Sequence, residues 1–131
     1  MTGWVPSVGA AMLVPSGAIG NHLFVIVLGP KVLPGYGPHP QVLLLSVTSI
    51  KPGIPIDPAC LLDVGDHDFI KHPSYVYYRK PRIELASSVE QYVVGGQWPR
   101  RNPLSAGILD RVLVGIDTSG AAPGWLRALF K

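Results

Sequence analysis

The sequence predicts a mainly β fold with short helices toward its C-terminal end, an α+β domain built on a small antiparallel barrel or rolled sheet. Two observations support this fold class. Short apolar, β-branched runs alternate with turn residues, and the whole chain holds 15 glycines and 14 prolines. Helix-type spacing of apolar residues begins only after residue 85. We expect one domain over 1–131, with an irregular arm (1–20), a β-barrel core (21–85) and a helical part (86–131).

The clearest strands are predicted at residues 22–28 (HLFVIVL) and 41–50 (QVLLLSVTSI), each bounded by glycine or proline. A loop of about ten residues between them suits antiparallel neighbours. Two further strands are predicted at 59–64 and 74–79. Residues 82–85 would continue the last strand past Pro81, a residue type that belongs at a sheet edge or a bulge. The arm before residue 21 has no clear period and is expected to hold at most one short strand.

Three helical segments are expected after the strands. A serine at 87 or 88 would cap the first, which would end at Gly95-Gly96. Asn102 would cap the second, with Pro103 in its first turn. The third would start at Pro123 and carry a short apolar stripe.

Composition and charge narrow the functional classes. Charged residues make up 15% of the chain and the net charge is +3, so a basic binding surface would have to be a local patch. Cys60 is the single cysteine, which excludes an internal disulfide and suits a reducing compartment. The N-terminus lacks the pattern of a secretory signal, and no apolar run reaches the ~18 residues of a spanning helix. We therefore expect a cytoplasmic protein with no membrane partner.

Side chains capable of chemistry gather in residues 65–79. A glycine at the start and a proline in the middle predict a structured loop between two strands, and functional residues concentrate on such loops. His67 and His72 are the side chains best suited to move protons near neutral pH. Asp66 or Asp68 would orient one of the two imidazoles.

This set fits metal-free RNA cleavage, in which a base takes the 2′-hydroxyl proton, an acid protonates the leaving oxygen, and cations steady the phosphate. The candidate catalytic residues are His67, His72, Lys71 and Ser74, and the candidate RNA contacts in the same stretch are Arg79 and Tyr75. A structural interpretation stays open beside this one. A loop Asp-His pair often stabilises a turn, Lys71 would then be a solvated charge, and Tyr75 would pack in the core.

A second basic stretch lies at Trp98, Arg100 and Arg101, where an aromatic ring and two guanidinium groups could hold an RNA backbone and stack on a base. The alternative is an exposed linker with solvated arginines. His22 or His39 could complete the site, although a lone histidine is more often structural.

Other chemistries find little support in the sequence. The acidic and histidine residues match no common zinc spacing, and no Gly-x-Ser-x-Gly elbow surrounds a serine. The glycines do not follow a strand into a helix in the spacing of a nucleotide-binding loop. We expect no metal and no other cofactor.

Residues 63–76 (DVGDHDFIKHPSYV) resemble the central motif of small bacterial proteins grouped with toxin-antitoxin systems. The strand layout, with residues 39–46 as a core strand, is similar to the MazF/PemK-like growth-inhibitor toxins. This resemblance implies an SH3-like barrel, metal-free cleavage of single-stranded RNA, a homodimer, and a cognate antitoxin as partner. The family's opening Gly-Asp-aromatic strand is missing from residues 1–20, and its Pro-x-Thr segment is replaced by residues 47–49. No catalytic position is therefore carried over from the family.

Three functions are compatible with these observations. The first is the toxin of a toxin-antitoxin pair, acting as an endoribonuclease. The second is a non-catalytic SH3-like module that binds protein or nucleic acid through the same loop. The third is an accessory protein of phage or mobile-element origin.

Overall fold

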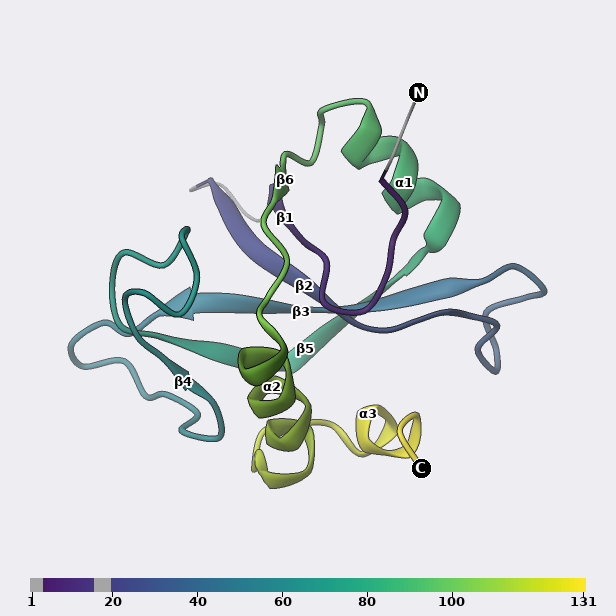
Figure 1. Ribbon diagram of the computed structural model, residues 1–131. Coiled ribbons are helices and arrows are strands. Elements are labelled where there is room, and N and C mark those ends of the chain that lie inside the picture. Colours follow the sequence, from purple (N-terminus) through teal and green to yellow (C-terminus); the bar gives the residue numbers. More distant parts are fainter. Residues whose placement is uncertain (1–3, 16–19) are drawn as a thin grey trace.

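The computed structural model describes residues 4–15 and 20–131, and within them the chain forms an antiparallel sheet curled into a half-barrel, with a few short helices (Figure 1). The strands are β1 (Ala11–Pro15), β2 (Asn21–Lys31), β3 (Gln41–Ser49), β4 (Leu61–Leu62), β5 (Ser74–Leu85) and β6 (Arg100–Arg101). The helices are α1 (Ala86–Val94), α2 (Ala106–Thr118) and α3 (Gly124–Ala128). The strand order in the sheet is β4-β5-β3-β2-β1-β6. The predicted fold class, mainly β with short C-terminal helices, is confirmed.

The central strands β2 and β3 each contain a long buried apolar run, because both faces of the sheet are covered there. In β2, Leu23 and Val25 belong to one buried cluster, and the alternating residues Phe24 and Ile26 belong to another. This is the alternation that a strand requires, since successive side chains point to opposite faces. As the sequence predicts, the two strands pair antiparallel. In the observed register, Leu23 pairs with Val47.

Helices cover both faces of the sheet: α1 lies on one side, and α2 and α3 lie on the other (Figure 1). Val89 and Val93 of α1 pack in the cluster that contains Phe24. Val112 and Ile116 of α2 pack in the cluster that contains Leu23. The chain between α1 and α2 passes along the free side of β1, where β6 pairs with it.

The long strand β5 runs through Pro81 without ending. Its pairing with β3 is irregular between Tyr77 and Arg82, so the proline, which has no backbone N–H, lies where the regular pairing is interrupted. On its other edge, β5 is paired by β4 only at Ser74 and Tyr75. Beyond Tyr75, that outer edge of the strand is open to loops rather than to another strand.

Several predicted boundaries are wrong. The strand expected at 59–64 is reduced to the two residues of β4, because local hydrogen bonds take over: the Asp63 amide donates to Asp66 Oδ2 (2.8 Å), and the Asp66 amide donates to the Asp63 carbonyl (3.0 Å). Residues 11–15 form β1, whose Met12 is fully buried, and this agrees with the expectation of at most one short strand in the arm. Residues 1–3 and 16–19 of that arm lie outside the described residues.

The predicted helix caps are also wrong. Leu85 precedes α1, and no side chain caps that helix, so the serines at 87 and 88 do not have this role. Ser105 caps α2, with its hydroxyl accepting the Ile108 amide hydrogen at 3.3 Å, whereas Asn102 bonds elsewhere. The end of α1 at Gly95 agrees with the prediction.

One close contact fixes α2 against the sheet. The buried Tyr78 of β5 donates its hydroxyl hydrogen to the Val112 carbonyl of α2 at 2.7 Å. A Cβ atom added at Gly115, also in α2, would lie 2.0 Å from the Tyr78 hydroxyl oxygen. Only a residue without a side chain fits there.

Within the described residues, no helix combines the length and the apolar character needed to cross a membrane.

Candidate functional site

A pocket of about 510 Å³ lies at the end of the sheet where β2 begins, β3 ends and β5 begins. Its apolar wall includes Leu23, Val47 and Ile70 from the buried cluster under α2. We call it the cationic pocket, and its lining residues are Asn21, His22, Leu23, Val47, Thr48, Ser49, Lys51, Phe69, Ile70, Lys71, His72, Ser74 and Arg101.

Positive charge dominates this lining. Lys51, Lys71 and Arg101 bring permanent cations, and His22 and His72 bring two imidazoles. None of the described lining residues is acidic. Among the ion pairs of residues 4–15 and 20–131, none involves Lys51, Lys71 or Arg101. The cations of the lining are therefore not held in ion pairs with carboxylates of the described residues, and an anionic ligand is favoured there.

The loop between β4 and β5 presents Lys71 and His72, and both side chains are exposed. Two hydrogen bonds hold this part of the loop. The hydroxyl of the buried Ser74 donates to the His72 carbonyl at 2.8 Å, and the Ile50 amide donates to the Pro73 carbonyl at 2.9 Å. Ser74 thus positions the backbone of His72, and its hydroxyl hydrogen is already engaged.

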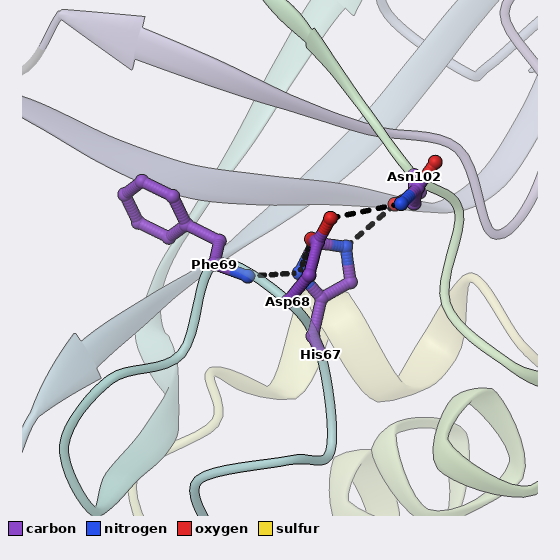
Figure 2. A network of polar contacts seen from close by, with 4 residues as sticks. All are labelled: His67, Asp68, Phe69 and Asn102. Atoms are coloured by element: carbon purple, nitrogen blue, oxygen red, sulfur yellow. Dashed lines mark hydrogen bonds and ion pairs between the residues drawn. The ribbon is translucent and has the colours of Figure 1, made fainter.

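His67 lies in the same loop but is buried, with 6% of its surface exposed, and it does not line the cationic pocket. Figure 2 shows its contacts: the Phe69 amide donates to Nδ1 at 3.0 Å, and Nε2 lies 2.6 Å from the Asn102 carbonyl oxygen. Because Nδ1 accepts, the neutral ring carries its hydrogen on Nε2 and donates it to Asn102. An Asp68 carboxylate oxygen lies 3.1 Å from Nδ1.

These bonds form a clamp between two distant segments, which we call the Asn102 clamp. The other carboxylate oxygen of Asp68 accepts a hydrogen bond from the Asn102 side-chain amide at 2.8 Å (Figure 2). The neighbouring Arg101 places its guanidinium 5.3 Å from the centre of the Phe69 ring, within the range of a cation–π contact. Since Phe69 and Arg101 both line the cationic pocket, the clamp sets the geometry of one wall.

The structure brings together only some of the residues that the sequence singled out. Lys71, His72, Ser74 and Arg101 line the cationic pocket. His67 stands behind its wall, so its pairing with His72 as proton-transfer residues has no support in this geometry. The remaining candidates, Tyr75, Arg79, Trp98 and Arg100, lie elsewhere.

Those remaining candidates occupy three places. Tyr75 and Arg79 line a smaller pocket beside the open edge of β5. Trp98 is buried in the cluster under α1, with its ring 4.7 Å from that of Tyr92 and 5.1 Å from the Arg82 guanidinium carbon. Arg100 is exposed and lines a shallow cavity next to the N-terminal segment.

Sequence reasoning missed Lys51, which follows β3 and lines the cationic pocket. A signal was available, because the end of one predicted strand must lie beside the start of its antiparallel neighbour. The register indeed pairs Ser49 with Ser74, which brings the loop after β3 next to the loop before β5. His22, which the sequence offered as a residue that could complete the site, does line the pocket.

Two other kinds of site, a nucleophilic cysteine and a metal site, have little support in the described residues. Burial raises the pKa of the Cys60 thiol, so this side chain stays protonated near neutral pH and is a poor nucleophile. In the part of the chain that the structure describes, no group of three or more His, Cys, Asp and Glu side chains is placed to hold a metal ion.

No protein-family model matches this chain, and no curated protein matches it in sequence.

Proposed function

We propose that the protein is a metal-independent endoribonuclease that cleaves single-stranded RNA in the cationic pocket, and that it acts as the toxin of a toxin-antitoxin pair. One observation carries the enzymatic part. Two imidazoles and three permanent cations line a single pocket whose described lining holds no carboxylate.

The pocket suits a nucleic-acid backbone in charge and size. Phosphate groups dominate the affinity of proteins for nucleic acids, and Lys51, Lys71 and Arg101 supply the cations that neutralise them. A volume of about 510 Å³ lies within the range of ligand sites and is large enough for a nucleotide unit. The hydroxyl groups of Thr48 and Ser49 add hydrogen-bond donors for phosphate oxygens.

The chemistry requires two proton transfers, and His22 and His72 are the proposed pair. One imidazole takes the proton of the 2′-hydroxyl, and the 2′-oxygen attacks the adjacent phosphorus. The other imidazole gives a proton to the departing 5′-oxygen, which leaves a 2′,3′-cyclic phosphate and a free 5′-hydroxyl. Lys71 and Arg101 steady the negative charge that develops on the non-bridging oxygens.

The toxin part of the proposal depends on the resemblance of residues 63–76 to the central motif of small toxin-antitoxin proteins. This segment contains Lys71 and His72, two of the residues that line the cationic pocket. By the same resemblance, the proposed partners are RNA, a cognate antitoxin and a second copy of the chain. The proposed compartment is the cytoplasm, which the single cysteine favours.

An RNA cleavage assay in EDTA tests the enzyme. We expect the wild type to cleave single-stranded RNA under these conditions, and His22→Ala and His72→Ala each to lower the rate at least about 100-fold. His39→Ala is the matched control, because His39 is an exposed histidine in the loop between β2 and β3 and does not line the pocket. Its rate should stay within about twofold of the wild type.

Two outcomes would contradict the enzyme. Cleavage that disappears on chelation would rule out the metal-free mechanism, and equal rates for all three variants would rule out the site. RNA binding without cleavage would favour the non-catalytic module.

For the toxin part, expression of the wild type should arrest bacterial growth, and His72→Ala should relieve the arrest. Normal growth with the wild-type protein present would contradict this part alone.

A further inference from the structure

A second pocket, of about 280 Å³, lies beside β5 next to the point where β4 begins. We call it the tyrosine pocket. Three segments build it, namely the loop before β4, the first half of β5, and the turn after α2. Its lining residues are Pro55, Ile56, Asp57, Pro58, Tyr75, Tyr77, Tyr78, Arg79, Gly120 and Ala121.

Two of its tyrosines have hydroxyl groups that form no hydrogen bond to a described residue. Tyr75 is buried, with 7% of its surface exposed, yet its hydroxyl forms no hydrogen bond to a described residue. No fully buried side-chain oxygen in that part of the chain lacks a partner, so solvent reaches this hydroxyl. Tyr77 likewise has no hydrogen bond to a described residue. Tyr78 differs, since its hydroxyl bonds to the Val112 carbonyl.

Charged groups of both signs line the same pocket. Arg79 is exposed and takes part in none of the ion pairs found among the described residues. Asp57 is held in place, because its Oδ1 accepts the Ala59 amide hydrogen at 3.0 Å and its Oδ2 accepts the hydroxyl hydrogen of Ser119. A carboxylate has about four acceptor sites, so Asp57 keeps acceptor capacity for a ligand.

We propose that the tyrosine pocket binds one base of the RNA strand, and that Asp57 favours a base with an exocyclic amino group, such as cytosine, over uracil. This inference rests on the proposed function. Of the pocket's aromatic and cationic groups, the partly exposed Tyr77 ring and the exposed Arg79 guanidinium are the ones that can reach a base, and proteins stack unpaired bases on such groups. Aspartate accepts hydrogen bonds from the amino group of cytosine, whereas uracil presents a carbonyl oxygen at that position.

Size and place agree with this assignment. The pocket lies just below the usual range of ligand sites, which suits a single ring system rather than a whole nucleotide. Ser74 lines the cationic pocket, and the next residue, Tyr75, lines the tyrosine pocket. Both pockets therefore border the first residues of β5, on which successive side chains point to opposite faces. In this proposal, one strand of RNA that passes the start of β5 places a phosphate in the first pocket and a nearby base in the second.

Binding of short 2′-O-methyl oligonucleotides tests the inference, since they lack the nucleophilic hydroxyl and stay intact. The wild type should bind oligo(C) more tightly than oligo(U), and Asp57→Asn should abolish this preference. Tyr77→Ala should weaken oligo(C) binding roughly tenfold without changing its salt dependence. Lys71→Ala in the cationic pocket should instead lower the salt slope by about one. Tyr36→Ala is the control, because Tyr36 is 50% exposed in the loop between β2 and β3.

The outcomes separate this inference from the proposed function. If Lys71→Ala weakens binding but Tyr77→Ala does not, the base subsite is wrong and the RNA function stands. If the wild type binds no oligonucleotide at low salt, the proposed function itself fails. Asp57 also bonds to Ser119, so Asp57→Asn must keep the wild-type unfolding midpoint to be informative. Equal affinity of the wild type for oligo(C) and oligo(U) would overturn the role of Asp57 without any variant.

Discussion

His67 and His72 show how differently two histidines of one loop can be used. His67 is buried and bonded through both ring nitrogens, while His72 is exposed at the mouth of the cationic pocket. The partner that buries His67 is Asn102, which lies 35 residues later in the chain. Local sequence identifies both side chains as capable of proton transfer, but it contains no information about this distant contact.

Substitution of the two histidines should therefore change the free energy of unfolding by very different amounts. His67→Ala leaves the Phe69 amide and the Asn102 carbonyl without their partner, so we expect the free energy of unfolding to fall by about 2–3 kcal/mol. His72→Ala removes an exposed side chain and should change it by less than about 0.5 kcal/mol. Urea denaturation of the two variants measures both values. Equal losses of stability would contradict the structural role of His67.

Gly115 is a second residue whose role depends on a single contact. Alanine is normally the better helix former, but its Cβ would lie 2.0 Å from the Tyr78 hydroxyl oxygen. We expect Gly115→Ala to lower the free energy of unfolding by about 1–3 kcal/mol, the usual cost of overpacking. Gly107→Ala, in the same helix and with no atom near its Cβ position, should raise it by about 0.5–1 kcal/mol. A stabilising effect of both substitutions would contradict the close packing of α2 on β5.

At the scale of elements, the strands with long apolar runs were predictable and the short ones were not. β2 and β3 are covered on both faces, so their sequences carry a signal along their whole length. β4 and β6 have two residues each, and they exist because neighbouring strands pair with them. The cap of α2 illustrates the same limit. Asn102 has the residue type of a cap, but its amide bonds to Asp68, and Ser105 caps the helix instead.

The sequence identified most charged and histidine residues of the candidate site, but not that they come together: His22 and Arg101 were named as separate candidates, and Lys51 was missed. The stretch 65–79 supplied Lys71, His72 and Ser74, but the cationic pocket also takes His22, Lys51 and Arg101 from other segments. Arg101 reaches the pocket because β6 pairs with β1, and Lys51 reaches it because β3 ends beside the start of β5. Convergence of this kind follows from strand register, which apolar patterns alone do not specify.

At the scale of the whole molecule, the hydrogen bond from Tyr78 to Val112 ties the sheet to the helices on one side of it. Burial raises the pKa of the Tyr78 phenol well above its usual value of 10.0, and the nearby Cys60 adds to the effect. Below pH 10 the phenol is protonated in both the folded and the unfolded chain. Above it, the unfolded chain loses the proton and the folded chain keeps it, so unfolding becomes more favourable.

This difference predicts how stability depends on pH. The contribution of Tyr78 is fully present below about pH 10, and above that the free energy of unfolding should fall by up to about 1.4 kcal/mol per pH unit. Tyr78→Phe should cost about 1 kcal/mol at pH 7 through the lost hydrogen bond, and its stability should fall less steeply above pH 10. Urea denaturation between pH 7 and 11 measures both curves. Parallel curves for the two proteins would show that the phenol does not cause the fall.

The placement of the pocket relative to the two buried clusters has a consequence for how this chain can diverge. The clusters are built from residues in the middle of β2, β3 and β5, whereas Lys51, Lys71 and His72 stand in loops beyond the strand ends. Substitutions of these loop residues can change the charge and shape of the cationic pocket while the buried residues of the strands keep their sequence. The pocket can therefore change between related chains without a change of the sheet that supports it.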